Sequence, residues 1–206
     1  MTQQIELYGA MTGNSLRAAI SLEEAGIPYV PRRVDLQAGA QRESPYLSLN
    51  PAGKVPTLVD HSSEPALILN QSNAIIQYAD EKSPGRLSPM DDFNGRLHTL
   101  DRYFFFVTDV IAPSHAAFFL RNHGEHKAGE VIDYQVRRQV AEMELFLTED
   151  FMAGEQFSMA DISAFTLINS IKNQLDWTAF PRLARWFELI QNRPGVKAGL
   201  KAFGKD

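Results

Sequence analysis

The chain of 206 residues contains no cysteine, and that absence excludes several kinds of chemistry. A protein without thiols has no structural disulfide, no thiolate metal site and no cysteine nucleophile of its own. Five histidines remain, but His115, His123 and His126 show no recognised ligand spacing, so we expect no metal site. Solvated loops or helix ends are the better interpretation of these histidines.

Long apolar runs and basic runs are also missing. No segment has about 18 uninterrupted apolar residues, and the first residues do not place a charged region before an apolar one. We therefore expect no membrane span and no secretion signal, and we place the protein in the cytoplasm. The formal net charge is −5, from 25 acidic and 20 basic residues, and no basic stripe with aromatics predicts a nucleic-acid partner.

The composition of the chain is typical of a globular protein, with 44% hydrophobic residues. Its length suits one large or two small domains. In the first part, short apolar runs predict strands at 5–9, 29–36, 57–59 and 66–69. A helix capped by Asn14 or Ser15 should run to about Ala25 and stop at Gly26, and another should open at Ser72. This order favours a small mixed sheet covered by helices.

From residue 83 the pattern becomes purely helical. Apolar residues at helical spacing predict helices around 97–104, 132–147, 162–168 and 183–190. Pro113 must kink or end the first of these, Ser158 and Asp161 form a capping-box pattern, and residues 193–195 (RPG) should close the last. We expect an α/β domain at 1–82, a linker at 83–92 and an all-helical domain at 93–206.

Residues 50–58 (NPAGKVPTL) place a proline directly before a predicted strand. The simpler interpretation is a loop with two trans prolines, because most X–Pro bonds are trans. A cis Val55–Pro56 bond would instead turn the N–H and C=O of Val55 outward together, where they could pair with an extended peptide as if it were another strand. Such a loop suits a peptide ligand.

Two helix starts carry polar side chains that have both a structural and a functional interpretation. The Ser72 hydroxyl could cap its own helix, or it could bind a carboxylate together with the free N–H groups there and the Gln71 amide. Residues 12–15 (TGNS) could likewise cap the first helix, or donate hydrogen bonds that lower the pKa of a ligand thiol.

Six segments in this order resemble the cytosolic glutathione S-transferase family over essentially the whole chain. They are 7–9 (LYG), 21–29 (SLEEAGIPY), 50–58, 71–78 (QSNAIIQY), 158–162 (SMADI) and 180–194. The resemblance implies an α/β plus all-α fold: a thioredoxin-like mixed-sheet domain that holds glutathione, and a C-terminal all-helical domain that shapes a hydrophobic second site.

The resemblance also assigns the glutathione contacts. It implies Val55 before a cis Pro56 on the cysteinyl backbone, and Ser72 with the Gln71 amide on the γ-glutamyl end. Lys54 is placed near the glycyl end, with Asn50 as a weaker choice. Many relatives have an acidic residue at the position of Gln71, although zeta-like classes also show Gln-Ser, so one ion pair with the ligand is lost here.

The sulfur-activating residue is left open among three residues of the first helix start. Residues 10–17 (AMTGNSLR) resemble the Nu-type pattern of Thr, then Asn, then a basic residue, which ranks Thr12 first and Asn14 second. Ser15 is third, as a serine-type activator. Arg17 either adds positive potential or points to solvent, while Tyr8 is expected to pack within its strand.

The helical domain is expected to supply the pocket for a hydrophobic electrophile. Its predicted lining residues are Met11, Phe104, Phe105, Phe118 and Phe119, although aromatic clusters are more often core. The resemblance implies a homodimer, with Asp101 and Arg102 near the interface.

The reaction implied is attack by the bound glutathione thiolate on a small hydrophobic electrophile, without a covalent protein intermediate. Glutathione-dependent disulfide or peroxide reduction is the second choice and isomerisation the third. A non-catalytic binding protein with the same fold remains as an alternative of another kind.

Overall fold

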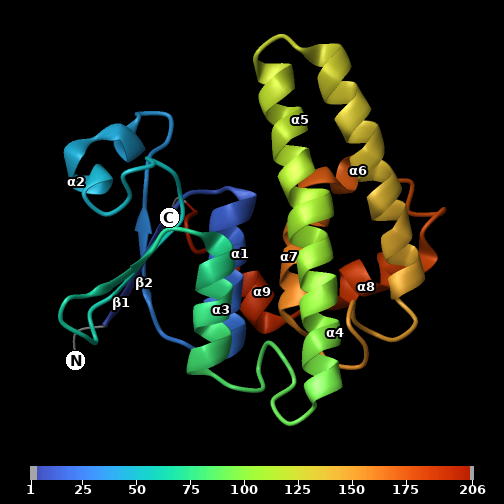
Figure 1. The fold of residues 1–206 in the computed structure, drawn as a ribbon, viewed down its shortest axis with the longest axis horizontal. Helices are drawn as coiled ribbons and strands as arrows, with labels where there is room; N and C mark the ends of the chain where they lie inside the picture. The colour runs from blue at the N-terminus through green and yellow to red at the C-terminus, as the bar shows by residue number, and fades with distance from the viewer. Residues whose placement is uncertain (1–3, 205–206) are drawn as a thin grey trace. The chain divides into compact units, whose positions relative to one another are not determined.

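The computed structural model describes residues 4–204, and these divide into two compact units (Figure 1). The first unit combines residues 1–87 with 192–206, and the second comprises 88–191. Residues 1–3 and 205–206, at the ends of the two expected domains, lie outside the described part. Residues 192–206, which the sequence assigned to the helical domain, group with the first unit instead.

The first unit is built on a four-stranded mixed sheet in the order β2-β1-β3-β4. The strands are β1 (Ile5–Gly9), β2 (Val30–Arg33), β3 (Thr57–Asp60) and β4 (Leu67–Leu69). Strand β1 is parallel to β2 and antiparallel to β3, and β3 is antiparallel to β4. This arrangement confirms the predicted mixed sheet, although β2 is shorter than the expected 29–36.

Two long helices pack on this sheet, and their apolar faces form the core of the unit. They are α1 (Gly13–Ala25) and α3 (Ser72–Lys82), and Ile20 and Ile75 on them are fully buried together with Leu7 of β1. Helix α1 ends where Gly26 takes a left-handed conformation, as expected. The 3-10 turn η1 (Ala40–Arg42) and helix α2 (Ser44–Leu47) lie in a stretch for which no element was predicted.

Helix α9 (Pro194–Gly199) brings the end of the chain back onto α1. Gly199 lies so close to Ile20 that an added Cβ would be 2.6 Å from its Cγ1 atom, and the buried Phe203 ring packs on Gly9 in the same way. Arg193 donates to the Glu24 carboxylate at 2.7 and 3.1 Å. The predicted helix around 183–190 ends at Gln191, just before residues 193–195, as expected. A further helix, which was not predicted, begins at Pro194, whose missing N–H costs nothing at the first helical position.

The second unit is helical throughout its regular structure. Its elements are α4 (Phe93–Phe104), the π-helical segment η2 (Phe105–Ile111), α5 (Ala112–Asn122), α6 (His126–Phe146), α7 (Met159–Ile171), η3 (Lys172–Gln174) and α8 (Pro181–Gln191). Together with the sheet unit, this confirms the predicted fold class.

Helices α4 and α5 join through η2 into one continuous run, coloured green to yellow-green in Figure 1. Pro113 does not end it. The wider π-helical turns lie directly before the proline, where its missing N–H and its ring would disturb regular α-helical bonding. Within residues 4–204, this run (93–122) is the one helix long and apolar enough to cross a membrane by length and composition, a test that soluble core helices also pass.

Candidate functional site

The start of α1 holds the three residues proposed to face a sulfur atom. Thr12, not Asn14 or Ser15, is the N-cap: its hydroxyl accepts from the Ser15 N–H at 3.4 Å. The Ser15 hydroxyl is fully buried, receives the Ala10 N–H at 3.3 Å and accepts from the Thr12 hydroxyl at 3.1 Å. Ser15 is thus enclosed, whereas Thr12 and Asn14 remain half-exposed.

Arg17 lies one turn further along α1 and is buried, with 3% of its surface exposed. Its Nη1 atom donates to Asn14 Oδ1 at 3.1 Å and to Ser72 Oγ at 3.4 Å. The alternative in which Arg17 points to solvent was therefore wrong. The guanidinium brings together residues from the starts of α1 and α3.

The loop before β3 carries a cis peptide bond between Val55 and Pro56, which confirms the less common of the two alternatives. Neither the N–H nor the C=O of Val55 bonds to another residue of the described range 4–204. The preceding Lys54 carbonyl accepts from Tyr46 Oη at 2.6 Å and from Asn50 Nδ2 at 2.7 Å. The Val55 backbone is therefore available to a ligand while the loop around it is held in place.

Asn50 and Lys54 differ in what they can offer a ligand. Asn50 is 2% exposed, and its amide bonds the Lys54 carbonyl and the Ala52 N–H, so it belongs to the frame of the loop. The Lys54 side chain is exposed and free to reach an anionic group.

A buried polar network below this loop was not predicted from the sequence. The Thr57 hydroxyl donates to Asn70 Oδ1 at 2.8 Å, and Asn70 Nδ2 donates to the Leu49 carbonyl at 3.0 Å. The Tyr46 hydroxyl lies 3.0 Å from Thr57 Oγ1, and burial raises the pKa of Tyr46. The network ties the cis-proline loop to the strand end that precedes α3, and no local pattern marks residues so far apart in sequence as partners.

The start of α3 offers unfilled backbone donors and a buried hydroxyl. Gln71 is the N-cap and makes no side-chain bond to the helix, so the alternative in which the Ser72 hydroxyl caps its own helix was wrong. Ser72 is the first helical residue, is 6% exposed and faces Arg17. Gln71 is exposed beside it. A helix N-terminus with a hydroxyl and a buried cation beside it is suited to a carboxylate.

The predicted lining of the hydrophobic site is divided between the two units. Met11, 58% exposed, belongs to the first. In the second, Phe104, Phe118 and Phe119 are each more than half exposed, whereas Phe105 packs edge-on against Phe146 with ring centres 5.0 Å apart. Phe105 is thus partly a core residue, and the others are free to contact a ligand or another chain.

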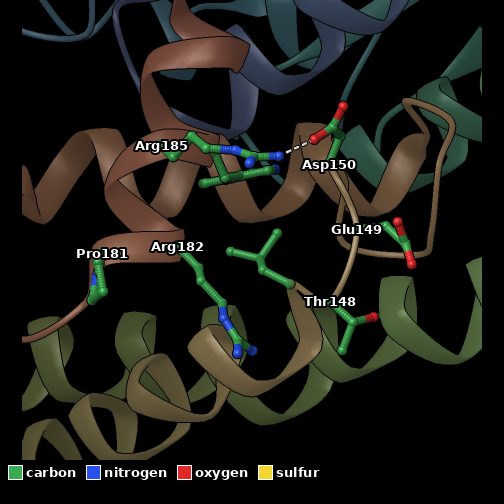
Figure 2. Close-up of a pocket in the computed structure, with 8 residues that line it drawn as sticks. Thr148, Glu149, Asp150, Pro181, Arg182 and Arg185 are labelled. Atoms are coloured by element: carbon green, nitrogen blue, oxygen red, sulfur yellow. Dashed lines mark hydrogen bonds and ion pairs between the residues drawn. The ribbon is translucent and has the colours of Figure 1, made fainter.

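A cavity of about 260 Å³ lies elsewhere in the second unit, between the end of α6 and the start of α8 (Figure 2). It is lined by Leu147, Thr148, Glu149, Asp150, Pro181, Arg182, Arg185 and Trp186. Asp150 and Arg185 form an ion pair across its rim. None of the predicted site residues lines it, and its charged rim does not suit an apolar electrophile.

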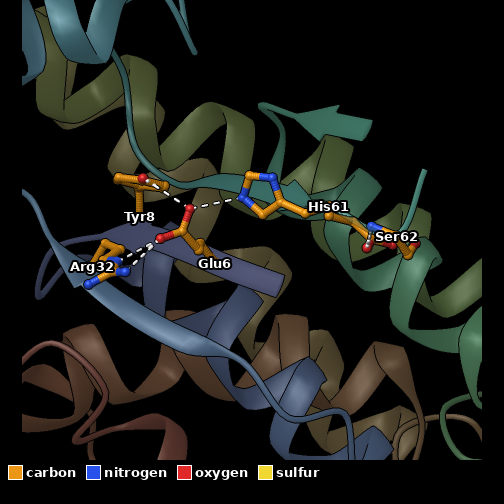
Figure 3. Close-up of polar contacts among 6 residues, drawn as sticks. Glu6, Tyr8, Arg32, His61 and Ser62 are labelled. Atoms are coloured by element: carbon orange, nitrogen blue, oxygen red, sulfur yellow. Dashed lines mark hydrogen bonds and ion pairs between the residues drawn. The ribbon is translucent and has the colours of Figure 1, made fainter. Parts of the chain in front are cut away.

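The Tyr8 hydroxyl is hydrogen-bonded to another residue of the sheet, so it is not offered as a donor at the start of α1 (Figure 3). Its hydroxyl donates to Glu6 Oε2 at 3.3 Å, and Glu6 also accepts from His61 at 3.0 Å and Arg32 at 2.8 Å. Burial raises the pKa of Tyr8, and the Glu6 charge raises it further. A phenol with a raised pKa that already donates to a carboxylate is a poor source of a thiolate-stabilising hydrogen bond.

The mixed sheet with a cis-proline loop, followed by an all-helical unit, defines a thioredoxin-like glutathione-transferase fold. Two family models match the chain: the glutathione S-transferase N-terminal domain over residues 13–82 and the glutathione S-transferase C-terminal domain over residues 108–202. The chain therefore belongs to the glutathione S-transferase family. The described residues contain no group of three or more side chains able to hold a metal ion.

The named relatives include an oxidoreductase and a transferase. The disulfide-bond oxidoreductase YfcG of Escherichia coli K12 is 32% identical, and the match covers 96% of this chain and 95% of YfcG. Glutathione S-transferase GstB of the same strain is 26% identical, with 94% and 96% covered. Among solved structures, a glutathione transferase from Burkholderia graminis with two glutathione molecules per subunit has a TM-score of 0.87 at 25% identity, with 99% of this chain and 90% of that chain covered.

Proposed function

We propose that the first unit binds glutathione between the Val55–Pro56 loop and the starts of α1 and α3. The free N–H and C=O of Val55 are the observation that carries this proposal, because they match what an extended peptide backbone needs. Ser72 and Gln71 receive the γ-glutamyl end, and Lys54 the glycyl carboxylate. The glutathione molecules in the related Burkholderia graminis structure support the choice of ligand.

The bound thiol is then ionised by donors at the start of α1. Thr12 and Asn14 are better placed than Ser15, whose hydroxyl is enclosed by Ala10 and Thr12. The positive end of α1 adds to the effect, since helix N-termini stabilise negative charge. As the chain has no cysteine, the ligand's thiolate is the sulfur nucleophile.

The first reaction we propose is transfer: the thiolate attacks a small hydrophobic electrophile, and the leaving group departs with its electron pair. The proposed contacts are Met11 of the first unit and, from the second, Phe105 and the exposed phenylalanines Phe104, Phe118 and Phe119. The fold and the relative GstB support this assignment.

Disulfide reduction is the second candidate, favoured by the similarity to YfcG. In it the glutathione thiolate attacks a disulfide, forming a mixed disulfide and releasing one thiolate. A second glutathione thiolate then attacks the mixed disulfide, giving glutathione disulfide and the second reduced thiol. Two electrons move from two glutathiones to the substrate, and no protein thiol takes part.

The test is calorimetric titration with glutathione, ultraviolet absorbance of the bound thiolate, and turnover with a haloaromatic, an organic peroxide and a small glutathione mixed disulfide. Ser72→Ala should weaken glutathione binding about tenfold, the effect of losing one hydrogen bond to a charged group. Ser63→Ala, an exposed serine of the β3–β4 turn, is the matched control. Absence of any heat of association contradicts the proposal, while binding without thiolate or turnover identifies a non-catalytic binding protein.

The proposal extends to assembly and location. We propose a homodimer, since α4 and α5 leave large apolar side chains exposed, and a cytoplasmic location, as the resemblance to the cytosolic family implies. Membership of the Nu-like or zeta-like class stays a prediction.

A further inference from the structure

One buried guanidinium lies between the starts of the two helices that the proposed ligand would touch. Nη1 of Arg17 is 3.1 Å from Asn14 Oδ1 on α1 and 3.4 Å from Ser72 Oγ on α3, and the side chain is 3% exposed. Asn14 belongs to the proposed sulfur end and Ser72 to the proposed γ-glutamyl end. A single atom therefore contacts both ends of the proposed site.

The contact with Asn14 determines which way its amide points. A guanidinium only donates hydrogen bonds, so the atom that faces it must be the carbonyl oxygen. Asn14 Nδ2 is thereby turned away from Arg17, and it bonds to no other residue in the described part of the chain. A free N–H donor is thus presented from the first turn of α1, where a thiolate would be stabilised. The Thr12 hydroxyl, in contrast, already donates to Ser15.

The contact with Arg17 also determines which way the Ser72 hydroxyl points. Arg17 donates to Oγ, so the hydroxyl proton is directed elsewhere, and between residues 4 and 204 Ser72 Oγ has no second partner. The hydroxyl is therefore held as a donor, which is the form that a carboxylate needs.

We propose that Arg17 is a positioning residue that aims the Asn14 amide nitrogen at the glutathione sulfur and the Ser72 hydroxyl at the γ-glutamyl carboxylate. This inference rests on the proposed glutathione function and makes Asn14 the main sulfur donor. We expect lysine to replace Arg17 poorly, because its compact, strongly hydrated ammonium sits on a flexible stem, whereas the planar guanidinium fixes the directions of the two N–H bonds on Nη1.

The experiment compares Arg17→Lys, Arg17→Met, Asn14→Ala and the double variant Asn14→Ala/Arg17→Lys with the wild-type chain. For each protein, thiolate absorbance against pH gives the pKa of bound glutathione, and calorimetry gives the Kd of glutathione and of S-methylglutathione, which has no ionisable thiol. Arg32→Met is the charge control, because Arg32 bonds Glu6 on another part of the unit. Melting temperature reports whether each variant is folded.

Both Arg17 variants should raise the pKa of the bound thiol by about one unit. At a pH well below that pKa, the fraction of thiolate should therefore fall roughly tenfold. They should also weaken S-methylglutathione binding about tenfold through Ser72. Asn14→Ala should raise the thiol pKa by a similar amount and leave the S-methylglutathione Kd unchanged. Adding Arg17→Lys to Asn14→Ala should raise the pKa no further, because two residues that act as one unit are not additive.

A folded Arg17→Lys variant with the wild-type thiol pKa overturns the inference, as does a fully additive double variant or an equal pKa rise in Arg32→Met. If Arg17→Met does not fold, Arg17→Lys and Asn14→Ala decide the question. Failure of the proposed function looks different: the wild-type chain then binds neither glutathione nor S-methylglutathione.

Discussion

Among single residues, Asp60 at the end of β3 connects the sheet to α3. Because it titrates, it also makes the stability of the fold depend on pH. It is 3% exposed and accepts from the Tyr78 hydroxyl at 2.7 Å and the Ser62 N–H at 2.9 Å, with Lys82 Nζ 3.4 Å away. Burial by itself would raise the pKa of Asp60, but these hydrogen bonds and Lys82 hold it at about 2. The same pairing, with burial, raises the pKa of Tyr78.

This depressed pKa predicts a defined loss of stability in acid. The unfolded carboxyl titrates near 3.8 and the folded one near 2, so the stabilisation is complete above pH 3.8 and disappears as the pH falls through 2. The shift corresponds to about 2 kcal/mol at neutral pH. Asp60→Asn should be less stable than the wild-type chain in urea unfolding at pH 7, and the difference should shrink below pH 4. A pH-independent difference would contradict the assignment.

Candidate site residues could be named from the sequence where one short segment carries the signal. Val55, Pro56 and the Gln71–Ser72 pair could be named because their chemistry follows from a proline before a strand and a polar helix start. The enclosure of Ser15 and the role of Asn50 could not, since both depend on bonds that form only in the folded loops. The direction of Arg17 depends on Ser72, a residue of another helix.

Among the elements, helix α7 is fixed by the carboxylate of Asp161 at its start. Asp161 is fully buried and accepts from the Ser158 N–H at 2.9 Å, the Met152 N–H at 2.9 Å and Trp186 Nε1 at 2.8 Å. The Ser158 hydroxyl accepts in turn from the Ala160 N–H, which completes the predicted capping box. One carboxylate thus joins the start of α7 to α8 and to the loop that precedes α7.

Loss of this carboxylate should be costly, since it leaves several buried donors without a partner. We expect Asp161→Ala to lower the free energy of unfolding by about 3–5 kcal/mol. Asp91→Ala, at an exposed aspartate before α4, should change it by less than about 0.5 kcal/mol. Urea titration followed by circular dichroism measures both, and equal effects would refute this role of Asp161.

Elements with a strong periodic pattern were predicted, and short or irregular ones were not. The strand at 5–9 and the helix opening at Ser72 match the structure at those ends. Helix α2 has four residues, too few for an amphipathic repeat to show. Pro113 was predicted to kink or end its helix; the helix does not end there, and the proline lies in the first turn of α5, just after the π-helical segment.

For the whole molecule, the exposed apolar residues of α4 and α5 bear on assembly. Phe93 and Leu97, 73% and 49% exposed, lie one turn apart on α4, and Asp101 follows one turn later, paired with Arg102 at 2.8 Å. An apolar stripe bordered by charges is typical of a protein interface.

We expect the chain to elute as a dimer in size-exclusion chromatography with light scattering. The double variant Phe93→Asp/Leu97→Asp should elute as a monomer, because it buries charge in the interface. Leu145→Asp, at a leucine of α6 that is 69% exposed, should remain dimeric. A monomeric wild-type chain would rule out the proposed assembly and leave the glutathione site untouched.

Because α9 packs on α1, the first unit begins at the N-terminus but is completed by the last residues to be synthesised. Phe203 packs on Gly9, three residues before Thr12, and Gly199 packs on Ile20. The entire helical unit is therefore synthesised before the side chains of residues 192–203 that complete the core of the first unit. A chain ending at Leu87 would leave this apolar surface of β1 and α1 open, so we expect the start of α1, which we propose faces the glutathione sulfur, to reach its final packing only once residues 199–203 are present.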